Sequence, residues 1–271
     1  MFENEYFNLG YLDTLSYRDT VIHRLDPRAK LIATLLFIVT VVSFPKYEIT
    51  GLLPFFLFPV LLFSLADVPV KFILKKVLLV SSFAVFIGIF NPVIDRRIVY
   101  SLLGVPVSGG WISFLSIMLK FFLTITSALL LIATTSFPGI CHALQKLGMP
   151  EIFVSQLLFL YRYLFVLTEE TMRIVRARDM RSFGSKGKGI KAFVHLAGTL
   201  FLRTVERAER IYQAMLSRGF AGRLHSVRSY RFSGADAAFV VATVAALYLF
   251  RAHDVVGAIG RFSMRVFLRD S

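Results

Sequence analysis

Long apolar runs constrain this chain more than any other feature of its sequence. A helix needs about 20 mainly apolar residues to cross a bilayer, because the hydrocarbon core is about 30 Å thick and each residue adds about 1.5 Å. The runs therefore predict an all-α polytopic membrane bundle with about five transmembrane helices. Pro54 and Pro59 should kink the second helix, and a turn-rich connector should join the third and fourth over 95–110. The runs cover residues 29–49, 49–66, 77–94, 111–135 and 235–250.

A basic segment, residues 136–234, separates the fourth run from the fifth and holds sixteen of the 31 Lys and Arg residues. Apolar residues recur there at helical spacing, which predicts helices over 139–147, 151–181 and 190–218. Gly219 suits the position just past the last of these helices. The two long helices each begin apolar and end basic. The chain therefore divides into N-terminal transmembrane helices (1–135), a helical domain (136–234), and a C-terminal transmembrane helix with a tail (235–271).

The formal net charge of +14 bears on the orientation of the spans. In a soluble protein it would indicate nucleic-acid binding, but in a membrane protein Lys and Arg collect on the cytoplasmic side. Lys71, Lys75 and Lys76, in a short loop after the second run, fall on the same side as segment 136–234 if the spans alternate. We therefore expect a multi-pass protein of the cell membrane with a cytoplasmic N-terminus, in contact with lipid and not with nucleic acid.

The tail is consistent with two arrangements. Arg261, Arg265 and Arg269 recur every four residues and so share one helix face. An amphipathic helix lying in the membrane interface would fit this spacing. A short re-entrant element that returns the tail to the inner side would fit equally well.

The sequence carries no motif for catalysis, cofactor binding or metal binding. The segment 184–189, GSKGKG, lacks the Lys-Ser/Thr ending of a phosphate-binding P-loop. No two histidines stand four residues apart as in a helical zinc site, and the single cysteine, Cys141, excludes an intramolecular disulfide. We therefore expect neither a catalytic residue nor a cofactor, and ATP hydrolysis should not occur on this chain.

Two groups of cations are candidate functional residues. Lys120 lies deep in the fourth run, where it could contact a partner or simply extend to the membrane surface. The other group is formed by the basic ends of the two long helices. Favourable placement of cations at helix C-termini accounts for them as well as a binding role does. The arginines are Arg173, Arg176, Arg178, Arg181, Arg207, Arg210 and Arg218.

Three segments resemble a known family, the transmembrane (T) component of energy-coupling factor (ECF) transporters, which are ATP-binding cassette importers. Residues 23–31, HRLDPRAKL, resemble the entry to that family's first span. Residues 173–182, RIVRARDMRS, and 206–220, ERAERIYQAMLSRGF, are similar to its two coupling signatures. The N-terminal stretch 8–24 looks closest to the cobalt-type subgroup, CbiQ.

The resemblance assigns roles to particular residues. Arg218, with Ser217 and Gly219, closes the second signature, although Ser217 replaces the usual alanine. Met180-Arg181-Ser182 replaces Ala-Arg-Gly in the first, so Arg181 is the first choice for its coupling arginine and Arg178 the alternative.

The resemblance also implies partners. Segment 136–234 would be a cytoplasmic coupling domain that binds two ATPase subunits. A separate membrane subunit, CbiM-like and possibly accompanied by a CbiN-like one, would capture cobalt or nickel ions. Two other functions stay open on the residues alone: a self-sufficient membrane carrier or membrane-embedded enzyme, and a lipid- or nucleic-acid-binding domain on a membrane anchor.

Overall fold

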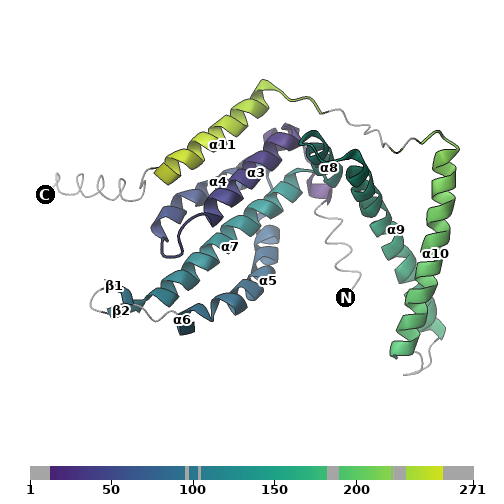
Figure 1. The fold of residues 1–271 in the computed structure, drawn as a ribbon, viewed down its shortest axis with the longest axis horizontal. Coiled ribbons are helices and arrows are strands. Elements are labelled where there is room, and N and C mark those ends of the chain that lie inside the picture. Colours follow the sequence, from purple (N-terminus) through teal and green to yellow (C-terminus); the bar gives the residue numbers. More distant parts are fainter. Residues whose placement is uncertain are drawn as a thin grey trace. The chain divides into compact units, whose positions relative to one another are not determined.

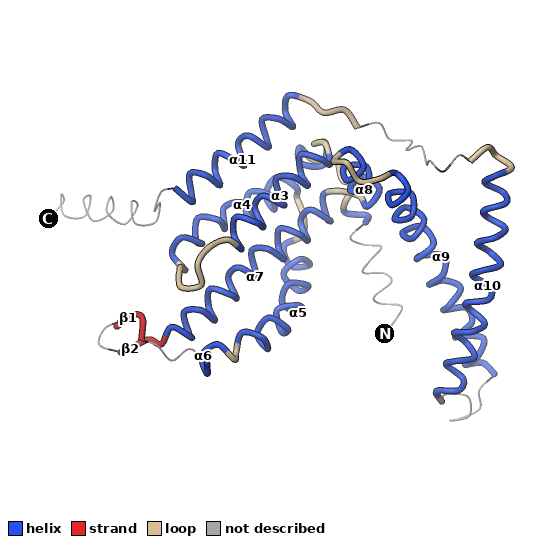
Figure 2. The backbone as a smooth tube through the Cα atoms, viewed as in Figure 1, coloured by secondary structure: helices blue, strands red, loops and turns tan. Residues whose placement is uncertain are grey.

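The structure is a computed structural model that describes residues 13–94, 98–102, 105–181, 189–220, 222 and 230–252. It is almost entirely helical, which confirms the predicted all-α membrane fold (Figure 2). A short antiparallel hairpin occupies part of the expected connector, with Leu102 opposite Val105. The elements are α2 (Val21–Arg24), α3 (Pro27–Val42), η1 (Thr50–Phe56), α4 (Leu57–Ala66), α5 (Val70–Gly88), α6 (Asn91–Ile94), β1 (Ile98–Leu102), β2 (Val105–Ser108), α7 (Gly109–Thr134), α8 (Phe137–Lys146), α9 (Glu151–Arg181), α10 (Ile190–Leu216) and α11 (Gly234–Ala252).

The chain forms two compact units, which are described separately. The first, called the bundle, comprises the described residues within Asn8–Ile140 and Tyr230–Ser271. The second, called the α9–α10 unit, comprises those within Cys141–Ser229. The assignment of the second unit to the cytoplasm stays a prediction.

In the bundle, α3 and α7 lie side by side (Figure 1). They run antiparallel, because one lysine bonds the start of α3 to the end of α7 and another bonds the residue just past α3 to an earlier part of α7. The Lys30 ammonium of α3 donates to the Thr134 carbonyl at the end of α7, at 2.7 Å. The Lys120 ammonium of α7 donates to the Phe44 carbonyl just past α3, at 2.6 Å. Helix α11 packs along α3 and η1, and α5 packs along α7. The Asp26–Asp236 hydrogen bond joins the start of α3 to the start of α11, so these two helices run in the same direction.

Aromatic side chains fill one of the two apolar cores of the bundle. Phe37 of α3 is fully buried and stacks on Phe58 of α4 at 4.5 Å between ring centroids. Phe55 of η1 meets Phe44 and Phe250 edge to face. The second apolar run is not one continuous α-helix. Pro54 lies inside the 3₁₀-helix η1, and α4 begins only at Leu57, because proline cannot donate the backbone hydrogen bond that an α-helix needs.

The prediction that Lys71, Lys75 and Lys76 lie in a loop is wrong, because all three belong to α5. The helix starts after Pro69, which serves as its N-cap residue. Ile73 and Val77 of α5 are buried in an apolar core. Their four-residue spacing fixes one buried helix face and directs the neighbouring lysines away from it. The continuous apolar run begins only at residue 77, so the amphipathic first turns of α5 were not recognised as helical from the sequence.

Three described helices are long and apolar enough to cross a membrane, namely α7, α9 and α11. The segment Thr50–Ala66 is a shorter apolar helix. Helix α3 has 16 residues, fewer than the roughly 20 that a span needs. Helix α9, which we placed in the cytoplasmic segment, has the composition of a span in its first part. The number five therefore stays a prediction.

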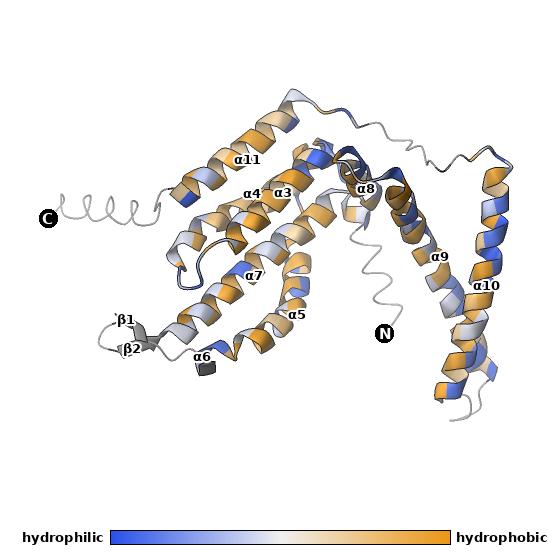
Figure 3. Ribbon diagram, viewed as in Figure 1, coloured by the Kyte–Doolittle hydropathy of each residue, from blue (hydrophilic) through white to orange (hydrophobic). Residues whose placement is uncertain are grey.

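The α9–α10 unit is an antiparallel helix pair preceded by the short helix α8. A Glu170–Arg203 ion pair at 2.9 Å joins the two long helices. Near the other end of the pair, the ring of Phe159 on α9 lies 6.4 Å from that of Phe220, just past α10. Buried residues are scarce: α10 has none, and α9 has only Val154 and Ser155. Figure 3 shows apolar residues along much of both helices, so their apolar surface lies open.

Candidate functional site

The first candidate arginines lie at the C-terminal end of α9. The Arg178 guanidinium is held by its neighbour Asp179, with Nη2 at 2.7 Å and Nε at 3.1 Å from the same carboxylate oxygen. Arg181, the last residue of α9, is exposed and makes no ion pair within the described part of the chain. Of the two alternatives, Arg181 is therefore the guanidinium free to bind an external carboxylate.

The acidic residues in the middle of α9 neutralise other arginines. Glu169 and Glu170 both form ion pairs with Arg173, which lies one turn further along the helix. Glu170 also pairs with Arg203 across the two helices. These pairs remove Arg173 from the candidate set and concentrate the uncompensated positive charge toward the helix end.

The second candidate set, Ser217, Arg218 and Gly219, forms a tight turn that ends α10. The Phe220 N–H donates to the Met215 carbonyl at 3.0 Å, and the Gly219 N–H to the Leu216 carbonyl at 2.9 Å. Gly219 has φ +77°, a left-handed conformation that favours glycine. This is a Schellman motif, so the predicted glycine cap is confirmed.

The turn gives Arg218 a defined position. The Ser217 hydroxyl donates back to the Gln213 carbonyl at 2.9 Å, which keeps the last turn of α10 closed. Phe220, just beyond the glycine, is half-buried against Phe159. The Arg218 side chain itself is exposed and has no ion pair among the residues that the structure describes. A fixed backbone therefore presents a free guanidinium.

The structure does not bring Arg181 and Arg218 together. Because α9 and α10 are antiparallel, their C-terminal ends point in opposite directions (Figure 1). Helix α10 has 27 residues, which corresponds to a length of about 40 Å. The unit thus carries two separate cationic sites at its opposite ends and not one cluster.

Lys120, the remaining candidate, has a partner inside the bundle. Its ammonium donates to the Phe44 carbonyl at 2.6 Å and approaches the Pro45 carbonyl at 3.4 Å. These carbonyls lie just past the end of α3, where backbone acceptors lack intrahelical donors. The contact gives Lys120 a structural role, and a contact with a second protein stays a prediction.

Sequence reasoning missed a buried polar cluster at the end of the bundle where α3 begins. Asp236 of α11 is only 2% exposed and accepts the Asp26 backbone N–H at 2.7 Å. Its other oxygen accepts from the Ser233 N–H at 2.6 Å and the Ser233 hydroxyl at 2.7 Å. Lys30, 5% exposed, lies close enough for attraction to both carboxylates. The pattern Ser233-x-x-Asp236 before an apolar run was the available signal, since it is a helix-capping sequence.

No metal or thiol chemistry is apparent at these sites. Among the residues that the structure describes, no three His, Cys, Asp or Glu side chains gather closely enough to hold a metal ion. Cys141 is buried, and burial raises the pKa of its thiol to about 11. A thiol of that pKa is protonated at neutral pH and a poor nucleophile.

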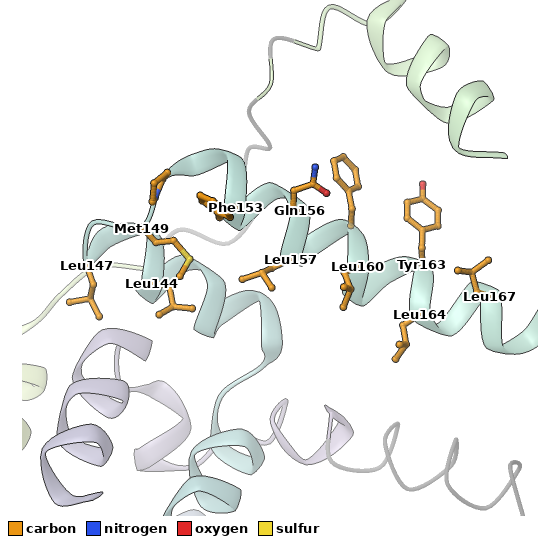
Figure 4. A pocket seen from close by; sticks show the side chains of 12 residues that line it. Leu144, Leu147, Met149, Phe153, Gln156, Leu157, Leu160, Tyr163, Leu164 and Leu167 are labelled. Atoms are coloured by element: carbon orange, nitrogen blue, oxygen red, sulfur yellow. The ribbon is translucent and has the colours of Figure 1, made fainter. Parts of the chain in front are cut away.

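An apolar groove of about 1050 Å³ runs along α8 and the first half of α9. Leu144 comes from α8 and Leu147 from the turn just past it, and most of the other lining residues come from α9 (Figure 4). Gln156 and Tyr163 are the polar side chains among the residues that line it. The groove can accept an apolar surface of a partner and offers few groups for chemistry.

Comparisons with known proteins agree on one family. A family model described as cobalt transport protein, CbiQ, matches residues 18–229. The energy-coupling factor transporter transmembrane protein EcfT of Bacillus subtilis (strain 168) is 28% identical over 250 residues, covering 85% of this chain and 94% of the relative. That of Bacillus selenitireducens is 30% identical over 220 residues, covering 75% and 81%. A protein named as a fused cobalt transport protein, CbiMQ, from Methanocorpusculum labreanum is 37% identical over 90 residues, 33% of this chain and 15% of the relative.

Proposed function

The chain belongs to the cobalt transport protein (CbiQ) family of energy-coupling factor transmembrane components, and on this premise we propose that it couples ATP hydrolysis by partner ATPases to solute uptake. It is a membrane protein and a component of a transporter. In the proposal it is a scaffold without catalysis of its own. Its bundle spans the cell membrane with a cytoplasmic N-terminus, and its α9–α10 unit meets two ATP-binding cassette subunits.

One observation carries the proposal: two exposed arginines, neither with an ion pair to a described residue, stand at opposite ends of an antiparallel helix pair. Arg181 ends α9 and Arg218 follows α10. With the roughly 40 Å length of α10 between them, each arginine can reach a different ATPase subunit. A single helix end could serve only one.

The chemistry of arginine suits this role. A guanidinium is always charged and pairs with a carboxylate through two parallel hydrogen bonds. In the proposal, acidic residues on each ATPase subunit bind Arg181 and Arg218. Arg178 contributes less, because Asp179 already occupies its guanidinium.

The apolar surfaces of the α9–α10 unit have a separate role in the proposal. The groove along α8 and α9 and the exposed apolar face of α10 bind the membrane subunit that captures the solute. That subunit is CbiM-like, with or without a CbiN-like companion, and the solute is cobalt or nickel ion. The family description and the fused CbiMQ relative support this assignment.

The test replaces Arg218 by Glu in the complete transporter. We expect Arg218→Glu to lower co-purification of the ATPase subunits by about tenfold or more and to abolish cobalt uptake, because a like-charge contact replaces an ion pair. Arg218→Lys keeps the charge but loses the paired hydrogen bonds, so it should fall between Glu and Arg. Arg181→Glu should act in the same way.

Lys191→Glu is the matched control, since it replaces a cation by an anion at an exposed site of the same helix, α10, that is not among the candidate arginines. It should leave co-purification and uptake close to those of the unmodified protein. Equal recovery of the ATPase subunits with Arg218→Glu would overturn the proposal. Cobalt uptake into liposomes by the purified chain alone would favour a self-sufficient carrier instead.

A further inference from the structure

The polypeptide connects its two units twice. We call residues 134–141 the outgoing passage and the described residues 230–234 the returning passage, and both contain or adjoin residues bonded to the buried polar cluster. On the way out, α7 ends at Thr134 and the α9–α10 unit begins at Cys141. On the way back, the bundle resumes at Tyr230 and α11 begins at Gly234. These two passages are the covalent connections through which displacement of the α9–α10 unit can reach the bundle.

Lys30 fixes the outgoing passage. Its ammonium, 5% exposed, donates to the carbonyl of Thr134, the last residue of α7, at 2.7 Å. A buried ammonium that lost this acceptor would be strongly destabilised. The end of α7 is therefore held to the first turn of α3.

Asp236 fixes the returning passage. One of its carboxylate oxygens accepts the Asp26 backbone N–H at 2.7 Å, and the other accepts two hydrogen bonds from Ser233. Ser233 directly precedes α11, so the capping hydrogen bonds of α11 and the bond to α3 share one carboxylate. Both passages are thus bonded to the same five-residue stretch, 26–30.

Gly139, in the outgoing passage, lies close both to Pro27 of α3 and to Tyr230 of the returning passage. A methyl group added at Gly139 of α8 would lie 3.3 Å from the Pro27 ring and 3.2 Å from the Tyr230 hydroxyl. A larger residue at 139 would require these neighbours to shift by a few tenths of an ångström. Pro27 and Tyr230 therefore both lie beside the same point of the outgoing passage.

We propose that Asp26, Pro27, Lys30 and Asp236 form a clasp that makes both passages move with the bundle. The clasp residues are positioning residues for transport: they bind neither solute nor ATPase, and they pass displacement of the α9–α10 unit to the bundle as a whole. The proposal rests on the proposed function, because the displacement originates at the partner ATPases.

The first test measures the clasp without transport. Hydrogen exchange of the full-length protein in detergent should show the amides of Ile140 and Asp236 exchanging about tenfold faster or more in Lys30→Met and Asp236→Ala. Asp236→Asn keeps one acceptor oxygen and should give a smaller increase. Unchanged exchange at both amides would overturn the clasp, whatever the transporter does.

The second test measures coupling in the assembled transporter, as ATP hydrolysed per cobalt ion taken up into liposomes. Lys30→Met and Asp236→Ala should raise this ratio about tenfold, while co-purification of the ATPase subunits stays within about twofold. Asp236→Asn should give an intermediate ratio. A merely structural defect would lower assembly and hydrolysis together and leave the ratio unchanged.

Arg18→Met is the control, since it removes another cation–carbonyl bond of the bundle, from Arg18 to the Asp67 carbonyl, which joins neither passage. It should leave the ratio unchanged, and an equal rise would overturn the clasp. Failure of the unmodified chain to retain the ATPase subunits would instead overturn the proposed function. A normal ratio in Lys30→Met with retained subunits would overturn only the clasp.

Discussion

The bundle and the α9–α10 unit differ in how much of their apolar surface they bury. Helix α7 of the bundle has 26 residues and buries ten of them, whereas α10 has 27 and buries none. Lipid can cover the outward face of a helix in the bundle. A large open apolar surface marks a site that another protein or lipid covers. The difference teaches that the bundle forms apolar cores of its own, whereas the α9–α10 unit leaves its apolar surface open for the partners that the proposed function assigns to it.

Charge follows the same division. In the bundle, Lys30 and Asp236 are buried and hydrogen-bonded to other residues of the bundle. In the α9–α10 unit, Arg181 and Arg218 are exposed and unpaired within the described residues. Buried charges with internal partners hold a structure together, and exposed charges without them are available for binding.

The largest expected effect compares a phenylalanine from each unit. Phe37 is fully buried and Phe201 is 67% exposed. Phe37→Ala should lower the free energy of unfolding in detergent by about 3 kcal/mol, because it leaves a cavity. Phe201→Ala should change it by less than about 0.5 kcal/mol. Thermal unfolding of the purified chain measures both.

The same pair sharpens the comparison in the assembled transporter. There Phe201→Ala should weaken retention of the membrane subunit, since its side chain lies on the face that we propose to be covered. Phe37→Ala should leave retention intact at temperatures where it is folded. If Phe37→Ala and Phe201→Ala lowered the free energy of unfolding of the isolated chain equally, the two units would not differ in how they bury apolar side chains.

Much of the fold could be predicted from the sequence, because the signals are local. The apolar runs, Gly148-Met149-Pro150 and Gly219 mark where helices lie and end, and α9 was predicted with its observed bounds. Glycine ends both α8 and α10 with a left-handed residue, at φ +106° and +77°. The hairpin and the start of α5 were missed, because each depends on which face meets a neighbouring helix.

The candidate site was predictable only in part. The basic helix ends were visible in the sequence. The structure adds a second reason to prefer Arg181 over Arg178, namely the hydrogen bond between Arg178 and Asp179, whose geometry cannot be derived from the sequence. The Asp26–Asp236 bond joins residues 210 positions apart. Only the three-dimensional arrangement brings such residues together, so no local pattern could have paired them.

A middle-sized effect contrasts two glycines. A methyl group at Gly88 of α5 would lie 2.9 Å from the Phe114 ring, whereas one at Gly219 meets nothing within 4 Å. Gly88→Ala should cost about 1–2 kcal/mol through overpacking, and Gly219→Ala about 1 kcal/mol through its left-handed backbone. Asparagine tolerates that backbone but is larger, so Gly219→Asn should be nearly neutral and Gly88→Asn worse than alanine. The reverse order in thermal unfolding would contradict these two origins.

The smallest expected effect is a pH dependence confined to the bundle. His23 lies 2.8 Å from the Thr20 hydroxyl and 3.1 Å from the Leu15 carbonyl, an arrangement that suits a neutral imidazole. Burial lowers the pKa of His23, hydrogen bonds to the Ala133 and Leu15 carbonyls oppose this, and the positive charges of Lys30 and Arg18 add to the lowering.

Because the unfolded chain then binds a proton at higher pH than the folded one, stability is fully present above about pH 6.5 and declines as pH falls toward the folded pKa. The Tm should therefore drop slightly between pH 7.5 and 5.5. His23→Gln can keep both hydrogen bonds without titrating, so its Tm should be flat over the same range. An equal slope in the two proteins would assign the pH dependence to other groups. A slope present only with histidine would show that even a partly exposed polar residue of the bundle is held by internal contacts, as the comparison with the α9–α10 unit requires.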